Sequence, residues 1–107
     1  ARPGFLRLAF TPGEQRLRPG GLVSGPTQMA VADTAAYALV AAHLGPVEMA
    51  VTSALNMQFL RPCHPRTITA DAHMLRLGRR LVIMDVRLWT DEEAKPVSQA
   101  TVTYAPP

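Results

Sequence analysis

The sequence has one cysteine, no familiar catalytic motif and no spacing of metal ligands, and each absence excludes a class of protein. Cys63 alone cannot form an internal disulfide framework, so a reducing cytoplasm is the expected location. Nothing resembles a signal peptide or an uninterrupted membrane span, so no membrane partner is expected. A GxSxG elbow, a phosphate-binding loop and a dinucleotide fingerprint are missing, and the histidines share no metal-ligand spacing. We therefore predict neither a metal nor a cofactor.

Charge is also scarce. Charged residues make up 18% of the chain, below the usual ~25% of soluble proteins, which favours a surface covered by a second copy. The net charge of +3 comes without a run of lysine or arginine, so no specific nucleic-acid partner is indicated. We expect an obligate homodimer and leave open a tetramer built as a dimer of dimers.

The size and composition indicate a single domain. With 107 residues and 48% hydrophobic content, the chain can bury one core and is too short for two. No internal repeat or linker divides it, so residues 1–107 form one predicted domain. The chain begins with Ala1, and we leave open that its N-terminal segment is incomplete.

The run from Ser24 to Gly45 is the central predicted element. Ser24 and Gly25 sit where an N-cap belongs, Pro26 suits the first helical position, and Gly45-Pro46 supplies a stop. The helix is apolar on nearly every face, so we expect the rest of the protein to wrap around it. Asp33 lies well past the first turn, so neither capping nor the helix dipole explains it.

Strands are predicted on both sides of the helix. Residues 4–10 form a short strand, 15–17 a possible resumption of pairing, and the alternation in residues 49–60 places Thr52, Asn56 and Gln58 opposite an apolar face. Residues 66–77, 81–90 and 97–104 are further strands, and three long strands are expected to follow the helix as a meander. The predicted fold class is α+β, with an antiparallel sheet curled around one helix and its edge closed by a second copy.

The order of these segments resembles the hotdog-fold acyl-CoA thioesterases of the phenylacetate-pathway (PaaI-type) group. The resemblance is carried by the GG loop, ADTA in the helix, VTSALNMQFLRP, LRLGRRL and SQATVTY. It implies a hotdog fold and thioester hydrolysis, with coenzyme A as part of the substrate. It also implies that Asp33, as general base or nucleophile, acts on the thioester and that the Gly25 N–H polarises its carbonyl. The family commonly has His-Gly-Gly where this chain has Ser24-Gly25-Pro26, which makes Ser24 a candidate substrate contact.

Helix geometry constrains how these two residues could cooperate. Eight residues at a rise of ~1.5 Å separate Gly25 from Asp33 by about 12 Å, too far for both to act on one carbonyl. If both are catalytic, they must come from different subunits, with two equivalent sites across the dimer interface.

The resemblance also suggests supporting residues, each with a simpler alternative. Thr52 matches a position that often holds the attacking water, although threonine is also common in strands. Met29 and Tyr37, one turn from Asp33 on either side, would shape an acyl pocket or simply pack in the core. Asn56 and Gln58 would line that pocket or pair with the partner subunit, and we favour the second interpretation.

Arginines in the predicted connections are candidate contacts for the coenzyme A phosphates, since a guanidinium recognises phosphate well. The turn Gly78-Arg79-Arg80 is the stronger candidate, with Arg61 and Arg66 as others, and solvated surface arginines are the alternative. A nucleophilic pair of Cys63 and His64 is disfavoured because neighbouring side chains in a turn seldom face each other.

The leading hypothesis is an acyl-CoA thioesterase with Asp33, Gly25 and Thr52 as catalytic residues. The first alternative is a hotdog protein that binds acyl-CoA or an acyl carrier without catalysis, suggested by the altered helix start. Hydratase chemistry ranks low because no histidine lies near Asp33 in the sequence, and a purely structural dimerisation domain remains a further alternative. The acyl group and the pathway stay open.

Overall fold

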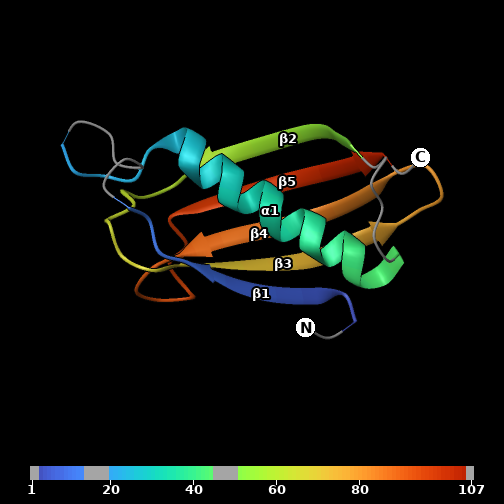
Figure 1. Cartoon of the computed structure of the whole chain (residues 1–107), viewed down its shortest axis with the longest axis horizontal. Coiled ribbons are helices and arrows are strands. Elements are labelled where there is room, and N and C mark those ends of the chain that lie inside the picture. The colour runs from blue at the N-terminus through green and yellow to red at the C-terminus, as the bar shows by residue number, and fades with distance from the viewer. Residues whose placement is uncertain (1–2, 14–19, 45–50, 106–107) are drawn as a thin grey trace.

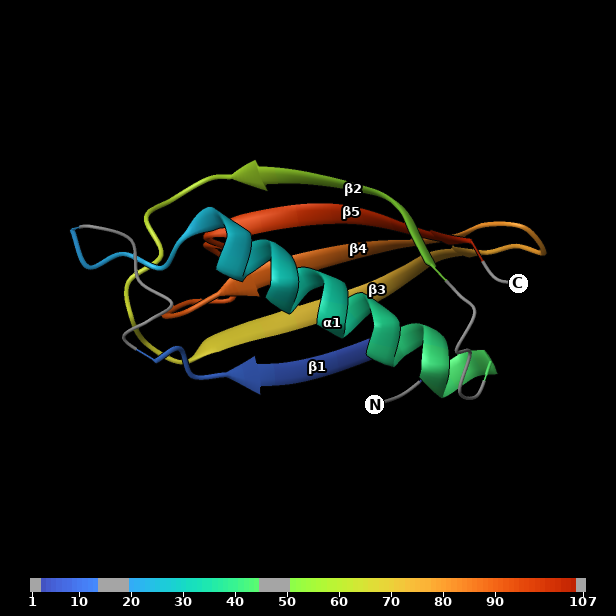
Figure 2. The same cartoon turned by 45° about the horizontal axis from the view of Figure 1, so that its top comes forward.

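The computed structural model describes residues 3–13, 20–44 and 51–105 and shows one sheet with one helix against it (Figure 1). The sheet has five antiparallel strands in the order β1-β3-β4-β5-β2. Helix α1 lies across one face, and the sheet curves around it (Figure 2). The predicted α+β hotdog architecture is confirmed. The elements are β1 (Phe5–Phe10), α1 (Gly25–Leu44), β2 (Val51–Phe59), β3 (Ile68–Leu77), β4 (Val82–Trp89) and β5 (Ser98–Ala105).

The predicted meander is present in β3, β4 and β5, which are neighbours in both sequence and space. Strand β2 is the exception, because it pairs with β5 rather than with β3 and forms one edge of the sheet. The connection of residues 60–67 therefore crosses from one edge of the sheet toward the other. It bonds to the segment before α1, where the Val23 N–H donates to the Cys63 carbonyl at 2.9 Å.

The start of α1 follows the predicted chemistry with a shift of one residue. Ser24 is the N-cap: its Oγ accepts from the Thr27 N–H at 3.3 Å, and its carbonyl accepts from the Gln28 N–H at 3.1 Å. Gly25 is the first helical residue and Pro26 the second, where a missing N–H is equally harmless. The predicted stop at Gly45-Pro46 and the possible pairing of residues 15–17 lie outside the described residues.

The helix is not wrapped on all sides. One face packs on the sheet and is fully buried, as at Ala32, Ala36 and Leu39, whereas Met29, Thr34 and Tyr37 are exposed on the other side. The reason is that a single sheet can cover only one side of its helix. The core accordingly lies between α1 and the inner face of the sheet, to which β4 contributes Val82, Met84, Val86 and Leu88 as predicted.

Candidate active site

Four helix residues spaced four apart form a stripe on the flank of α1 that faces β2. They are Gly25, Met29, Asp33 and Tyr37. Three of these residues have a partner in the sheet. Gly25 lies against the Phe59 ring, Asp33 bonds to Thr52, and the Tyr37 ring lies 6.2 Å from the ring of Tyr104. The stripe therefore runs along the free edge of the sheet.

The Asp33 carboxylate is half-buried and is held by two hydroxyl groups. Thr52 Oγ1 donates to Asp33 Oδ1 at 2.7 Å, and the Tyr104 hydroxyl donates to the same oxygen at 3.0 Å. Among the described residues no donor lies on Oδ2, and no cation pairs with the carboxylate. A carboxylate with one fixed oxygen and one free oxygen, and with only neutral partners, is suited to accept a proton.

Tyr104 was not predicted as a site residue. It is the inward-facing residue near the end of β5, 3% exposed, and its hydroxyl also reaches the Asp33 carbonyl at 3.2 Å. Burial, assisted by the nearby carboxylate, raises the pKa of Tyr104 to about 12, so the phenol stays protonated and donates at neutral pH. The one sequence signal available was the inward position of a tyrosine, since a buried hydroxyl needs a partner.

The predicted face of Thr52 is wrong, and a β-bulge is the reason. Thr52 pairs with Tyr104 and Ala54 with Thr103, so Ser53 is an extra residue in β2. The extra residue inverts the alternation, and Thr52 joins the helix-facing side with Tyr104. Without this inversion Thr52 would point away from Asp33.

Asn56 and Gln58 keep the predicted alternation and lie on the outer face of the sheet, opposite the helix. With Ala54, Gln99, Thr101 and Thr103 they line a shallow depression of about 320 Å³. Asn56 and the Asp33 of the same subunit therefore lie on opposite faces of the sheet.

The N–H of Gly25 is available at the helix start. The N–H groups of Thr27 and Gln28 bond to Ser24, Pro26 has none, and no acceptor for the Gly25 N–H is found in the described part of the chain. Side-chain space is restricted, because a Cβ at position 25 would come within 3.2 Å of the Phe59 ring. The helix start therefore retains one free donor at the positive end of the dipole. The Ser24 hydroxyl bonds to both the N–H and the hydroxyl of Thr27.

Exposed apolar side chains surround these groups. Met29 and Tyr37 are 40% and 39% exposed on the helix, and Phe59 and Leu60 are 53% and 52% exposed at the end of β2. Several large apolar side chains exposed on one flank of a small domain, here called the apolar rim, indicate a surface that binds a ligand or another chain. Met29 and Tyr37 are therefore at the surface beside Asp33 and not in the core.

The candidate phosphate contacts lie at opposite ends of the molecule. Arg61 and Arg66 precede β3, where Arg61 donates to the Pro96 carbonyl at 2.7 Å and Arg66 pairs with Asp91. Arg79 and Arg80 follow β3 in the turn to β4, and ten strand residues put the two ends roughly 30 Å apart. One subunit therefore does not gather these arginines into one cluster. Gly78 is required by the turn itself, because a Cβ there would lie 2.9 Å from the Leu81 carbonyl oxygen.

Cys63 and His64 do not form a pair. Cys63 is buried, its thiol is directed at the His64 carbonyl, and burial raises the pKa of the thiol to about 11. His64 is exposed. The low rank given to a Cys–His nucleophile agrees with this geometry.

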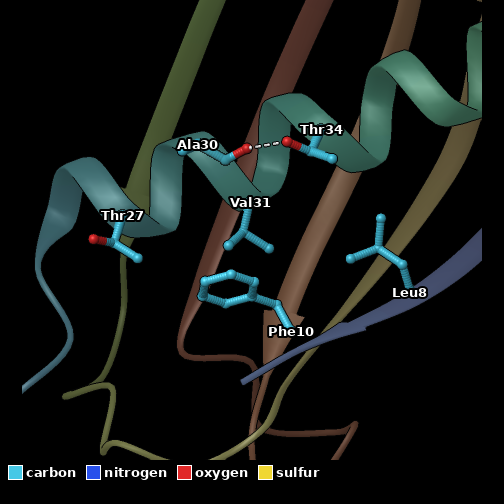
Figure 3. Close-up of a pocket in the computed structure, with 6 residues that line it drawn as sticks. All are labelled: Leu8, Phe10, Thr27, Ala30, Val31 and Thr34. Carbon is cyan, nitrogen blue, oxygen red and sulfur yellow. Dashed lines mark hydrogen bonds between the residues drawn. The ribbon is translucent and has the colours of Figure 1, made fainter. Parts of the chain in front are cut away.

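A separate cavity lies on the other flank of α1. It has a volume of about 140 Å³ and is lined by Leu8, Phe10, Thr27, Ala30, Val31 and Thr34 (Figure 3). The Thr34 hydroxyl bonds to the Ala30 carbonyl at 2.8 Å and not into the cavity. This cavity faces β1, whereas Asp33 faces β2, so it is not part of the Asp33 site.

Comparison with known proteins decides the family. The model of the thioesterase superfamily matches residues 20–97, which include helix α1 and strands β2, β3 and β4 and end just before β5. The chain belongs to the thioesterase superfamily. A provisionally named esterase of Saccharolobus solfataricus is 32% identical over 84 residues, covering 78% of this chain and 55% of that protein. The chain thus spans little more than half the length of this curated relative.

Solved thioesterase-superfamily structures agree with the fold. A provisionally named thioesterase from Silicibacter is 40% identical, with a TM-score of 0.86 over 97% of this chain and 73% of that one. The PaaI protein of the E. coli phenylacetic acid degradation operon is 25% identical, with a TM-score of 0.84 over 97% and 73% of the two chains. The resemblance to hotdog thioesterases of the PaaI type is confirmed. The described part of this superfamily member contains no helix that is long and apolar enough to cross a membrane.

Proposed function

We propose that this thioesterase-superfamily member is a cytoplasmic acyl-CoA thioesterase whose two active sites lie between the subunits of a homodimer. The observation that carries the proposal is the Asp33 carboxylate, which Thr52 and Tyr104 fix through Oδ1 while no donor from the described residues bonds to Oδ2. Beside a free sheet edge and an apolar rim, this geometry fits a base that activates water.

The proposed reaction uses no cofactor beyond the coenzyme A carried by the substrate. Asp33 Oδ2 takes a proton from water, and the oxygen attacks the thioester carbonyl carbon. The oxyanion is stabilised by the Gly25 N–H of the partner subunit and by its helix dipole. Collapse breaks the C–S bond, and the thiolate takes the proton from Asp33, giving a carboxylic acid and free coenzyme A.

The second subunit is proposed from strand β2. This edge strand has nine residues with neither a charge nor a proline, so nothing in it discourages pairing with another chain. Asp33 lies beside Thr52 at one end of β2, and Gly25 lies beside Phe59 at the other. Antiparallel pairing with a second β2, centred between Leu55 and Asn56, would bring the Asp33 end of one subunit to the Gly25 end of the other.

The same arrangement supports a role for arginines from both subunits. Arg61 lies at the Gly25 end, whereas Arg79 and Arg80 lie at the other end of the sheet, nearer Thr52. A coenzyme A molecule in a site between subunits would have access to arginines of both, which one subunit alone does not provide.

The first test is hydrolysis of a panel of short, medium, long and aromatic acyl-CoAs, measured as the release of free thiol. Asp33→Asn keeps the shape of the side chain and removes the base, so kcat should fall by about 100-fold or more. Asp91→Asn, on an exposed loop, is the matched control and should hydrolyse the best substrate normally. Saturable acyl-CoA binding without turnover on any substrate would instead support the non-catalytic alternative.

A second test addresses the shared site. Gly25→Pro removes the N–H, and Gly25→Ala adds a comparable Cβ while keeping it, so only the proline variant should lose about 100-fold in kcat. When Asp33→Asn and Gly25→Pro proteins are unfolded, mixed equally and refolded, half of the dimers should be hybrids with one intact site. Recovery of about a quarter of the wild-type activity is expected for a symmetric dimer. Absence of recovery would place both residues in one subunit or show that one of them is not catalytic.

A further inference from the structure

The buried hydroxyl of Tyr104 donates to Asp33, the residue on which the proposed reaction depends. Tyr104 and Asp33 are 71 positions apart in the sequence, on β5 and α1, and the hydroxyl reaches both Oδ1 and the backbone carbonyl of Asp33. Its ring packs in the core and is covered by the helix. The ring therefore serves packing, while the hydroxyl serves Asp33.

The two hydroxyl groups act on the same carboxylate oxygen from different strands. Thr52 reaches Oδ1 from the exposed edge strand β2, and Tyr104 reaches it from β5 beneath. Two donors on one oxygen fix the rotation of the carboxylate and leave the other oxygen as its open acceptor. Of the two, the Tyr104 donor is the more rigid, because its side chain is buried whereas Thr52 is exposed.

The backbone contact adds a second constraint. A hydroxyl within 3.2 Å of the Asp33 carbonyl and 3.0 Å of its carboxylate keeps side chain and main chain in one relative orientation. A half-buried aspartate without such a partner could turn its carboxylate toward water. Loss of the hydroxyl should therefore disorder the base without emptying the core.

We propose that Tyr104 is a positioning residue that orients the Asp33 carboxylate for attack on the substrate by water. The proposal rests on the proposed thioesterase activity and adds to it a residue outside the helix and the edge strand. Tyr104 does not touch the substrate, so its effect should appear in turnover and not in substrate affinity.

The test compares Tyr104→Phe with Ser98→Ala. Ser98 carries another buried hydroxyl on the inward side of β5, and no hydrogen bond joins it to Asp33 among the described contacts, so it is a matched control. Tyr104→Phe should lower kcat about tenfold, the equivalent of one hydrogen bond, and leave KM unchanged. Ser98→Ala should keep the wild-type kcat and KM.

Two results distinguish the failures. If Asp33→Asn is inactive but Tyr104→Phe retains the wild-type kcat, the positioning role is wrong and the proposed function stands. If Asp33→Asn remains active, the proposed mechanism itself is wrong.

A second measurement tests the proposal without the Tyr104→Phe variant, in case that variant folds poorly. In the Tyr37→Phe background, 3-fluorotyrosine labels position 104 alone and preserves its ring and hydroxyl. Fluorination makes the phenol ionise at lower pH, so the alkaline limb of kcat should move to lower pH. An unmoved alkaline limb would contradict the proposal.

Discussion

Two aspartates on opposite sides of the same sheet show what separates a structural carboxylate from a chemically available one. Asp71, on the outer face, is 3% exposed and receives the Arg7 guanidinium through both oxygens, at 2.6 and 2.9 Å, and the Trp89 indole N–H at 3.0 Å. Asp33, on the helix side, has two neutral donors on one oxygen. Burial alone would mark Asp71 as the more unusual group. Among the described residues, no donor bonds to Oδ2 of Asp33 and no cation pairs with it, and this is why we propose Asp33 as the reactive carboxylate.

The surroundings of Asp71 explain why it is ionised and structural. Burial opposes its ionisation, but the hydrogen bonds from Arg7 and Trp89 and the Arg7 charge outweigh that effect and lower the pKa of Asp71. The Arg7 guanidinium also lies 5.5 Å above the Trp89 ring and bonds to Glu93 at 3.2 Å. Asp71 on β3 thus bonds to Arg7 on β1 and Trp89 on β4, Arg7 continues to the β4–β5 loop, and both oxygens of Asp71 are occupied by donors.

The first prediction gives Asp33 the kind of partner that Asp71 has, a guanidinium group. Thr52→Arg places a guanidinium where the hydroxyl now bonds, so both carboxylate oxygens should become occupied and kcat should fall about 100-fold or more. Thr103→Arg, on the outer face of the neighbouring strand, controls for the added charge. Thr52→Val, which removes only the hydroxyl, should cost about tenfold. Equal activity of the Thr52→Arg and Thr52→Val enzymes would show that a free Oδ2 is not needed.

The converse change removes the charge from Asp71. Asp71→Asn sets an amide N–H against the Arg7 guanidinium, so the free energy of unfolding should drop by about 2 kcal/mol. Chemical denaturation measures this, and kcat of the remaining folded enzyme should be unchanged. A large loss of kcat at full stability would give Asp71 a role in the reaction.

Acid stability sharpens the difference. Because the folded pKa of Asp71 is below its ordinary value, the unfolded state binds the proton first as pH falls. The stabilisation is fully present above about pH 4 and is lost as pH falls through the lowered pKa. Denaturation series from pH 6 to pH 2 should show a shallower acid dependence in Asp71→Asn than in the wild type. Parallel curves would mean that other carboxylates carry the acid sensitivity.

The smallest expected effect concerns the Trp89 indole. Trp89→Phe keeps an aromatic ring under Arg7 and removes one donor from Asp71, so stability should fall by about 1 kcal/mol. Trp89 pairs in the sheet far from Asp33, and hydrolysis should not change. A loss as large as that of Asp71→Asn would show that the indole, not the guanidinium, holds the carboxylate.

The sequence predicted the elements well because their signals are local. The helix start at Ser24-Gly25, the alternation in β4 and the turn at Gly78 depend on residues close together in the chain. The outer-face cluster around Asp71 could not be predicted this way, because Arg7 and Asp71 are 64 positions apart and meet only when β1 pairs with β3. Asp33 could be singled out, but its partners could not.

The amino-acid sequence by itself determined the fold class, the helix with its unexplained Asp33, and a free glycine N–H at the helix start. Tertiary structure decided the face of Thr52, since one extra residue in β2 inverts an alternation that local reading assumes to be regular. It also decided that Tyr104 bonds to Asp33, because that contact requires β5 to lie beneath the helix. Which carboxylate keeps a free oxygen depends on donors brought from distant strands, and only the folded chain brings them together.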